Sequence, residues 1–139
     1  MKDSIVFPPL QAILDIHAEL LATHGGAPGL CDQGALEAAL ARPRQILAYA
    51  TEDVTVFDLV AALCVSLCRH QHPFIDGNKR IAFAALGMTL GLNGLYLDVK
   101  EREAAEIVRA IAAGEMDERA FREWVADNSF ELPDPRSEK

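Results

Sequence analysis

The sequence HPFIDGNKR at residues 72–80 joins two apolar stretches, FDLVAALCVSLC at 57–68 and IAFAALGMTLGL at 81–92. Stretches that are apolar on nearly all sides are typical of helices buried in a protein core. Pro73 disfavours continuation of the first helix, because the residue before a proline is pushed out of the α region. Gly77 allows backbone angles that other residues avoid. The sequence therefore predicts two central helices joined by a short polar loop.

The loop combines side chains that suit proton transfer and phosphate binding. His72 carries an imidazole, the side chain whose unperturbed pKa lies nearest neutrality, and is a candidate general base. We expect Asn78 to cap the next helix, whose first N–H groups form an anion site. Lys79 and Arg80 lie in the first turn of that helix, where cations are disfavoured unless an anion joins them. Asp76 is an oxygen ligand of the kind that Mg²⁺ takes beside substrate phosphates.

Each of these residues also has a purely structural explanation, as a turn former, a helix cap or a surface charge. Their combination within nine residues favours a site. A zinc site is a separate alternative, because Cys64, Cys68 and His72 recur at every fourth residue. The first and last of these positions lie about 12 Å apart along a helix, too far for one ion with bonds of about 2 Å. Core packing of the cysteines is therefore preferred.

Composition limits the possible classes of protein. The chain has 139 residues, with 13 basic and 21 acidic side chains and a net charge of −8. A field of this sign disfavours nucleic acid and anionic lipid as partners. No apolar run reaches the length of about 20 residues that spans a bilayer, and the start shows no signal-peptide pattern. Three cysteines without a disulfide pattern favour a reducing, cytoplasmic location.

Helical periodicity and stop signals predict an all-α bundle of about six helices. The expected elements are a helix between Pro8–Pro9 and Gly25–Gly26, then helices at 32–40, 56–71, 78–92 and 100–113, an extended piece at 95–99, and a final helix after Asp117. The second helix is expected to end before Pro43. The apolar side of the 100–113 helix is expected to hold Ala105, Val108, Ile111 and Ala112. We expect one domain over residues 1–130 and a disordered tail over 131–139.

The loop also resembles a known signature. His72-Pro73-Phe74-x-Asp76-Gly77-Asn78-x-Arg80 is similar to the motif His-Pro-Phe-x-Asp/Glu-Gly-Asn-x-Arg of the Fic/Doc superfamily, and the resemblance extends over about residues 10–125. Most Fic adenylyltransferases have Gly where this chain has Lys79, and a second Arg where it has Phe83. Both differences point to the Doc (death-on-curing) branch, the toxins of Phd–Doc toxin–antitoxin pairs.

The resemblance implies a toxin that transfers the γ-phosphoryl group of ATP to a Ser or Thr hydroxyl of a protein. In the Doc branch the target is a threonine of elongation factor Tu, and its modification stops translation. The implied roles in this chain are general base for His72, Mg²⁺ binding and hydroxyl orientation for Asp76, phosphate binding for the Gly77 N–H and Asn78, and charge neutralisation for Lys79 and Arg80.

The resemblance further implies a partner and a flap. The chain lacks the Ser/Thr-x-x-x-Glu-Gly/Asn inhibitory motif of many Fic proteins, so the restraint is expected to be a separate Phd-like antitoxin. A β-hairpin flap that aligns the target peptide is expected near Arg44–Glu52. Two alternatives stay open: a Fic-type protein adenylyltransferase that transfers AMP, and a catalytically idle module that binds a partner through the same groove.

Overall fold

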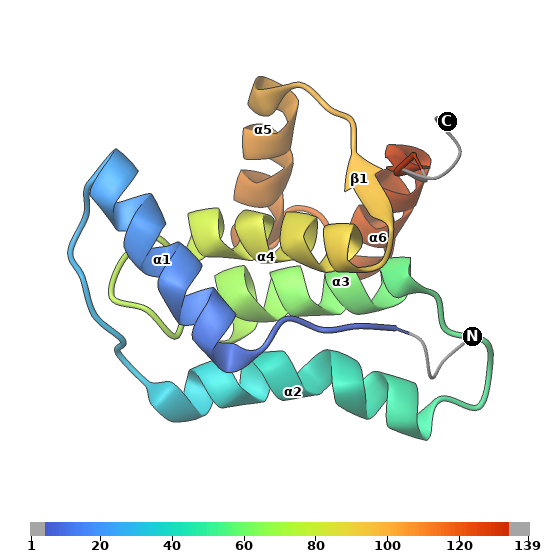
Figure 1. Cartoon of the computed structure of the whole chain (residues 1–139), viewed down its shortest axis with the longest axis horizontal. Coiled ribbons are helices and arrows are strands. Elements are labelled where there is room, and N and C mark those ends of the chain that lie inside the picture. The colour runs from blue at the N-terminus through green and yellow to red at the C-terminus, as the bar shows by residue number, and fades with distance from the viewer. Residues whose placement is uncertain (1–4, 134–139) are drawn as a thin grey trace.

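The computed structural model describes residues 5–133 and is largely helical (Figure 1). The elements are α1 (Leu10–His24), α2 (Gln33–Tyr49), α3 (Val56–Val65), the π-helix η2 (Ser66–His70), α4 (Asn78–Leu92), β1 (Leu95–Leu97), α5 (Glu101–Ala112), α6 (Glu118–Asp127) and β2 (Ser129–Glu131). The predicted all-α bundle with a small two-stranded antiparallel element is confirmed. The expectation of one domain over residues 1–130 stays a prediction.

Helix α3 is the centre of the core. It starts at a capping box, in which the Thr55 side chain accepts from the Asp58 N–H and the Asp58 carboxylate accepts from the Thr55 N–H. Every residue from Leu59 to Cys68 is buried, so the helix is covered on all sides, as its composition predicts. The last turn widens into η2, where the Gln71 N–H donates to the Ser66 carbonyl. Such π-turns occur frequently at functional sites, and this one leads directly into the 72–80 loop.

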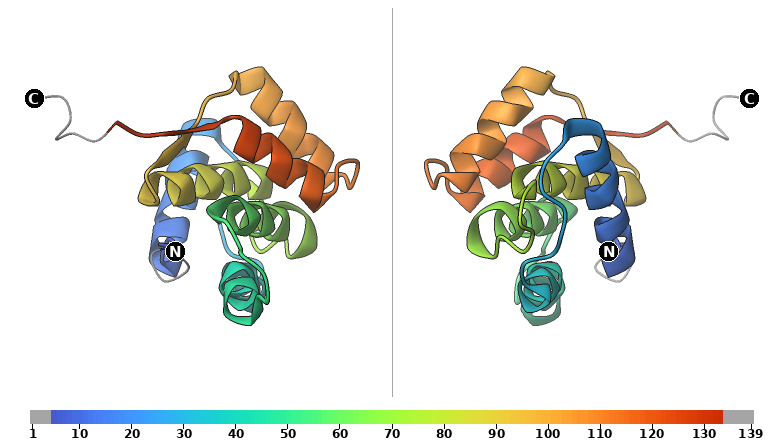
Figure 2. Two further views of the ribbon diagram at one scale, coloured as in Figure 1. Left: turned by 90° about the vertical axis from the view of Figure 1, so that its right-hand side faces the viewer. Right: turned by 90° about the vertical axis from the view of Figure 1, so that its left-hand side faces the viewer.

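The other helices surround α3 in layers (Figures 1 and 2). Helix α4 lies beside α3, and α2 and α6 pack against α3 on different sides. Helix α1 packs on α4, and α5 contacts both α4 and η2. The core side chains come from all of these helices, so the loop between η2 and α4 is attached to the most buried part of the chain.

The predicted end of the second helix and the predicted flap are wrong. Helix α2 continues through Pro43 to Tyr49, so residues 44–49 are helical and form no hairpin. A proline inside a helix costs about 3 kcal/mol, but Pro43 is buried and extends the apolar stripe of Leu36, Ala39 and Leu40 against α3. Arg42 adds a bidentate pair to Glu118 on α6 and a hydrogen bond to the Ala62 carbonyl.

The two-stranded sheet lies elsewhere. Strand β1 pairs antiparallel with β2, with Tyr96 opposite Phe130. Because β1 follows the C-terminal end of α4, the 15-residue helix separates it from the 72–80 loop by about 22 Å. Glu131 belongs to β2, so the predicted disordered tail starts too early; residues 134–139 lie outside the described part.

Two smaller observations complete the fold. Ala105 is exposed, and the buried residues of α5 are Ala104, Val108 and Ile111, so the assignment of Ala105 to the apolar side is wrong. Val108 and Ile111 were predicted correctly. Between residues 5 and 133, no helix combines the length and the apolar character needed to cross a bilayer.

Candidate active site

The 72–80 loop is held in shape by the side chain of Asn78. Its Oδ1 accepts from the Phe74 N–H at 3.0 Å, and its Nδ2 donates to the Phe74 carbonyl at 2.8 Å. The expected N-cap role is therefore wrong: Gly77 occupies the N-cap position in the left-handed region (φ 81°), and Asn78 is the first residue of α4. A buried amide that satisfies both backbone groups of Phe74 closes the bend rigidly.

The segment between α1 and α2 supports the loop from behind. The N–H groups of Cys31 and Asp32 both donate to the Pro73 carbonyl, at 2.8 and 3.1 Å, and the Ile75 N–H donates to the Gly29 carbonyl. These bonds fix the first half of the loop by backbone contacts that are independent of side-chain identity.

His17 on α1 is a residue outside the signature that supports the loop. Its ring is 5% exposed and stacks on the Phe74 ring, with centroids 3.7 Å apart and planes at 16°. Its Nε2 lies 2.8 Å from the backbone carbonyl oxygen of Asp76. A carbonyl can only accept, so Nε2 carries the proton in this contact. Gly77 passes close to the same ring, since a Cβ there would lie 3.4 Å from Nε2.

The carboxylate of Asp76 is exposed and fixed by two backbone donors. Its Oδ1 accepts from the Gly77 N–H at 2.8 Å, and its Oδ2 accepts from the Ala27 N–H at 3.3 Å. Each oxygen keeps acceptor capacity, so the group fits the expected Mg²⁺ role. No cluster of three or more His, Cys, Asp or Glu within residues 5–133 could hold a metal by itself. An ion here would need phosphate and water oxygens beside Asp76, as is usual for Mg²⁺.

A pocket of about 580 Å³ brings all six predicted site residues together. It is lined by His72, Ile75, Asp76, Gly77, Asn78, Lys79, Arg80, Arg109, Ala112 and Ala113. His72 is exposed and has φ 45°, a left-handed conformation that residues other than glycine adopt mainly in strained or functional positions. Lys79 and Arg80 are exposed in the first turn of α4, beside its free N–H groups. The pocket thus combines an imidazole, a carboxylate and cations at a helix N-terminus.

A larger hollow, about 730 Å³, lies between residues 50–54 and α6. Its charged lining is mostly carboxylate and includes Glu52, Asp53 and Glu118. It contains none of the predicted site residues and no histidine. We therefore assign the candidate site to the smaller pocket, where the groups for proton transfer and anion binding lie together.

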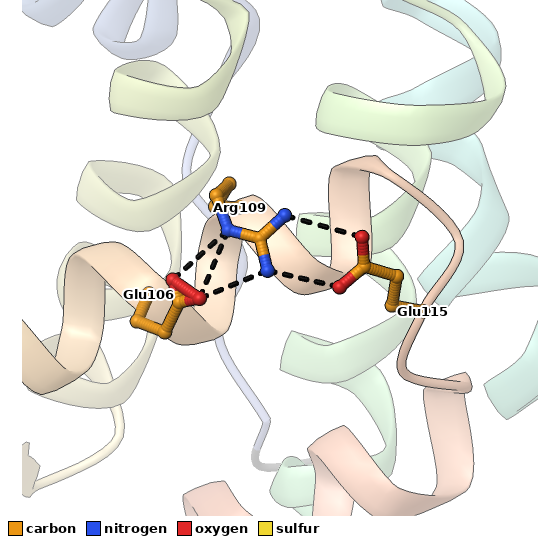
Figure 3. A network of polar contacts seen from close by, with 3 residues as sticks. All are labelled: Glu106, Arg109 and Glu115. Carbon is orange, nitrogen blue, oxygen red and sulfur yellow. Dashed lines mark hydrogen bonds and ion pairs between the residues drawn. The ribbon is translucent and has the colours of Figure 1, made fainter.

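Helix α5 and its C-cap contribute three lining residues that no sequence motif marks, Arg109, Ala112 and Ala113. Figure 3 shows the Arg109 guanidinium between the carboxylates of Glu106 and Glu115. Arg109 Nε donates to both Glu106 oxygens at 3.0 and 2.9 Å, and its two terminal nitrogens donate to Glu115 at 3.2 and 2.9 Å. These hydrogen bonds hold the pKa of both glutamates below its usual value and raise the pKa of Arg109.

The preference for core packing over zinc binding is confirmed for the two cysteines. Cys64 and Cys68 are both fully buried in the hydrophobic core, whereas His72 is exposed on the loop. A hydrogen bond with Cys68, together with burial, raises the pKa of the Cys64 thiol. Phe83, at the position of the second arginine of the related motif, packs against the core and adds no charge to the pocket.

Known proteins resemble the part of the chain that builds and supports the loop. The family model of the Fic/DOC family matches residues 7–90, which include α1, the supporting segment and the loop. "Toxin Doc" of Mycolicibacterium smegmatis (strain ATCC 700084 / mc(2)155) is 36% identical over 95 residues, 67% of this chain and 72% of that protein. "Protein kinase doc" of Escherichia phage P1 is 31% identical over 107 residues, 76% of this chain and 82% of that protein.

Proposed function

Because the chain belongs to the Fic/Doc family, and within it to the Doc branch, we propose that it is a toxin that phosphorylates a protein. The donor is ATP, and the acceptor is a Ser or Thr hydroxyl of the target. One relative bears the name of a toxin and the other that of a protein kinase, which supports this reading. The observation that carries the proposal is the single pocket that holds His72, Asp76, Lys79 and Arg80.

In the proposed reaction, the target hydroxyl oxygen attacks the γ-phosphorus of ATP. The bond between that phosphorus and the β,γ-bridging oxygen breaks, and ADP leaves with the electron pair. His72 accepts the hydroxyl proton, a role suited to an exposed imidazole that lines the pocket. The Asp76 carboxylate orients the incoming hydroxyl. Mg²⁺ bound at Asp76 would supply charge neutralisation for the phosphate oxygens.

The remaining groups stabilise charge. Phosphoryl transfer needs little covalent help from the protein, so position and electrostatic stabilisation supply most of the rate. Lys79 contributes a point charge, Arg80 a bidentate fork, and the first N–H groups of α4 a set of fixed donors. The Asn78 amide is engaged with Phe74, so its main contribution is to hold the N–H groups of the loop in place. Preorganised donors of this kind are worth roughly 3 kcal/mol each in other enzymes.

Transfer of the γ-phosphoryl group is proposed over transfer of AMP for two reasons in the sequence. Lys79 adds bulk and charge where adenylyltransferases have glycine, and Phe83 packs against the core where they have a second arginine. Incubation with a target lysate and ATP labelled at either the α- or the γ-phosphorus tests this directly. We expect protein-bound label from the γ position; label from the α position would show AMP transfer instead.

The target and the restraint are proposed by analogy with the Doc branch. The target is a translation factor such as elongation factor Tu, so the protein would act in the cytoplasm and stop growth. A Phd-like antitoxin would restrain it. A thermal melt with and without Mg-ATP separates this enzyme from an idle partner-binding module, because a ligand of the native state raises Tm. An unchanged Tm at saturating Mg-ATP would favour the idle module.

A further inference from the structure

A third cation lies against the pocket, on an element remote from the loop in sequence. We infer that Arg109 is an anion-binding residue of this pocket, held back by Glu106 and Glu115 until a polyphosphate replaces their carboxylates. This inference rests on the proposed function, since it names another group for the same phosphate chain. It extends the site from the loop to α5, so that the anion would be bound from two sides.

Placement is the first argument. Arg109 lines the pocket with Lys79 and Arg80, whereas neither of its carboxylate partners is among the lining residues. The lining therefore contains three permanent cations and one carboxylate, Asp76, in a chain whose net charge is −8. Once the two glutamates outside the lining are displaced, this balance of charge favours an anionic ligand.

The second argument is the excess of carboxylate around Arg109. All three guanidinium nitrogens bond to Glu106 or Glu115, so one cation is shared by two anions (Figure 3). A single partner would neutralise Arg109 and tie the α5–α6 turn to the end of α5. Two partners leave a surplus negative charge beside the pocket, which repels an incoming phosphate until at least one carboxylate moves away.

The third argument is that a phosphate can readily replace the glutamate carboxylates at Arg109. The side chains are well exposed, 47% for Arg109, 61% for Glu106 and 59% for Glu115. Ion pairs this open to water contribute little to stability and are screened by salt. A triphosphate carries several charges and accepts the bidentate guanidinium fork as well as a carboxylate does. A ligand already bound by Lys79 and Arg80 can therefore compete for Arg109 at high effective concentration.

Calorimetric titration at fixed ionic strength tests the inference, with inorganic tripolyphosphate and Mg-ATP as probes. The variants are Arg109→Gln and the double change Glu106→Gln/Glu115→Gln. Arg122→Gln removes an arginine that pairs with Asp58 outside the pocket, and Glu37→Gln/Glu123→Gln removes two exposed carboxylates on α2 and α6. These controls match the changes in net charge.

Loss of one charge-assisted contact corresponds to about tenfold in affinity. We expect Arg109→Gln to weaken tripolyphosphate binding by about tenfold, and Glu106→Gln/Glu115→Gln to strengthen it by about fivefold. Each control should change affinity by less than about twofold. Arg109→Lys keeps the charge but loses the fork, and should fall between wild type and Arg109→Gln. Binding by the double variant and not by wild type would also support the inference.

Other outcomes overturn it. If Arg109→Gln binds tripolyphosphate as tightly as Arg122→Gln does while Lys79→Gln abolishes binding, Arg109 has only a structural role. The proposed phosphate pocket then stands without it. If neither wild type nor the double variant binds either probe, both the inference and the proposed function fail. Melting curves of every variant establish that the protein titrated is folded.

Discussion

The Nε2 atom of His17 lies 2.8 Å from the backbone carbonyl oxygen of Asp76, across 59 residues of sequence. The same ring stacks on Phe74, so one buried imidazole contacts both the Phe74 ring and the Asp76 backbone. Orientation of the Asp76 carboxylate therefore depends on α1 as well as on the loop.

We predict that His17→Phe keeps the stacking on Phe74 but removes the hydrogen bond to Asp76. A lost hydrogen bond of this kind lowers the free energy of unfolding by about 1–2 kcal/mol, which urea denaturation measures. Phosphoryl transfer should fall more than Mg-ATP affinity, because the phosphate donors remain. His17→Gln, which can still donate, should recover part of the rate. Equal rates for the Phe and Gln variants would contradict a role for the hydrogen bond.

We predict that Gly26→Ala disables the site through a direct clash. Gly26 has φ 120°, and a Cβ there would lie 2.8 Å from Asp76 Oδ2. Gly25→Ala is the matched control, because Gly25 also has positive φ (80°) but a Cβ there meets nothing within 4 Å. Both changes introduce strain of about 1–3 kcal/mol, visible in Tm. Activity should be lost in the Gly26 variant and largely kept in the Gly25 variant; similar activities would refute the clash.

We predict that Asn78→Ala lowers the free energy of unfolding by about 2–3 kcal/mol, because two hydrogen bonds to Phe74 are lost in a buried position. The loop should also become accessible to proteases. Asn128→Ala removes one side-chain hydrogen bond at the end of α6 and should cost about 1 kcal/mol. Limited proteolysis and denaturation of both variants provide the comparison. Unchanged cleavage near residue 75 would show that the Asn78–Phe74 hydrogen bonds do not hold the loop in shape.

The pKa values of Glu106 and Glu115 are lowered by hydrogen bonds with Arg109. A lowered folded-state pKa gives stability that is fully present above the unfolded Glu pKa of about 4.3. That stability is lost as the pH falls through the lower folded-state values. The Tm difference between wild type and Arg109→Gln should therefore be small because the pairs are exposed, constant near neutral pH, and smaller still below about pH 4.3. A difference that persists at pH 2 would point to packing rather than charge.

Expression of the unmodified chain without a partner should arrest growth, and His72→Ala should relieve the arrest. His24→Ala is the control, because His24 is an exposed histidine that does not line the pocket. Growth curves with immunoblots for equal protein levels decide the result. If the His72 variant arrested growth as strongly as the unmodified chain, the proposed general-base role of the imidazole would be wrong.

The local parts of this protein could be predicted from sequence. The 57–68 and 81–92 stretches show their burial by composition, and the loop residues lie within nine positions of one another. The prediction for Asn78 was wrong for a physical reason. The same side-chain amide can cap a helix or bond to the backbone of a nearby residue, and only the position of the Phe74 backbone in three dimensions distinguishes the two.

The distant parts could not be predicted. His17 and Arg109 reach the site from α1 and α5, and nothing in their own neighbourhoods marks them. Helix α2 passes through Pro43 because burial against α3 outweighs the local cost, a balance that propensity does not contain. The predicted flap was wrong for the same reason, because residues 44–49 could form a hairpin only if the helix ended before Pro43.

The back support of the loop comes from residues 26–32, in the first quarter of the chain. In a genetic selection for survivors of the toxin, silencing changes should therefore collect at positions of that quarter where an added side chain disturbs the backbone support, such as Gly26, as well as in the signature. A gene copy with an intact HPFIDGNKR can consequently encode a harmless protein, and toxicity across related genomes cannot be inferred from the signature by itself.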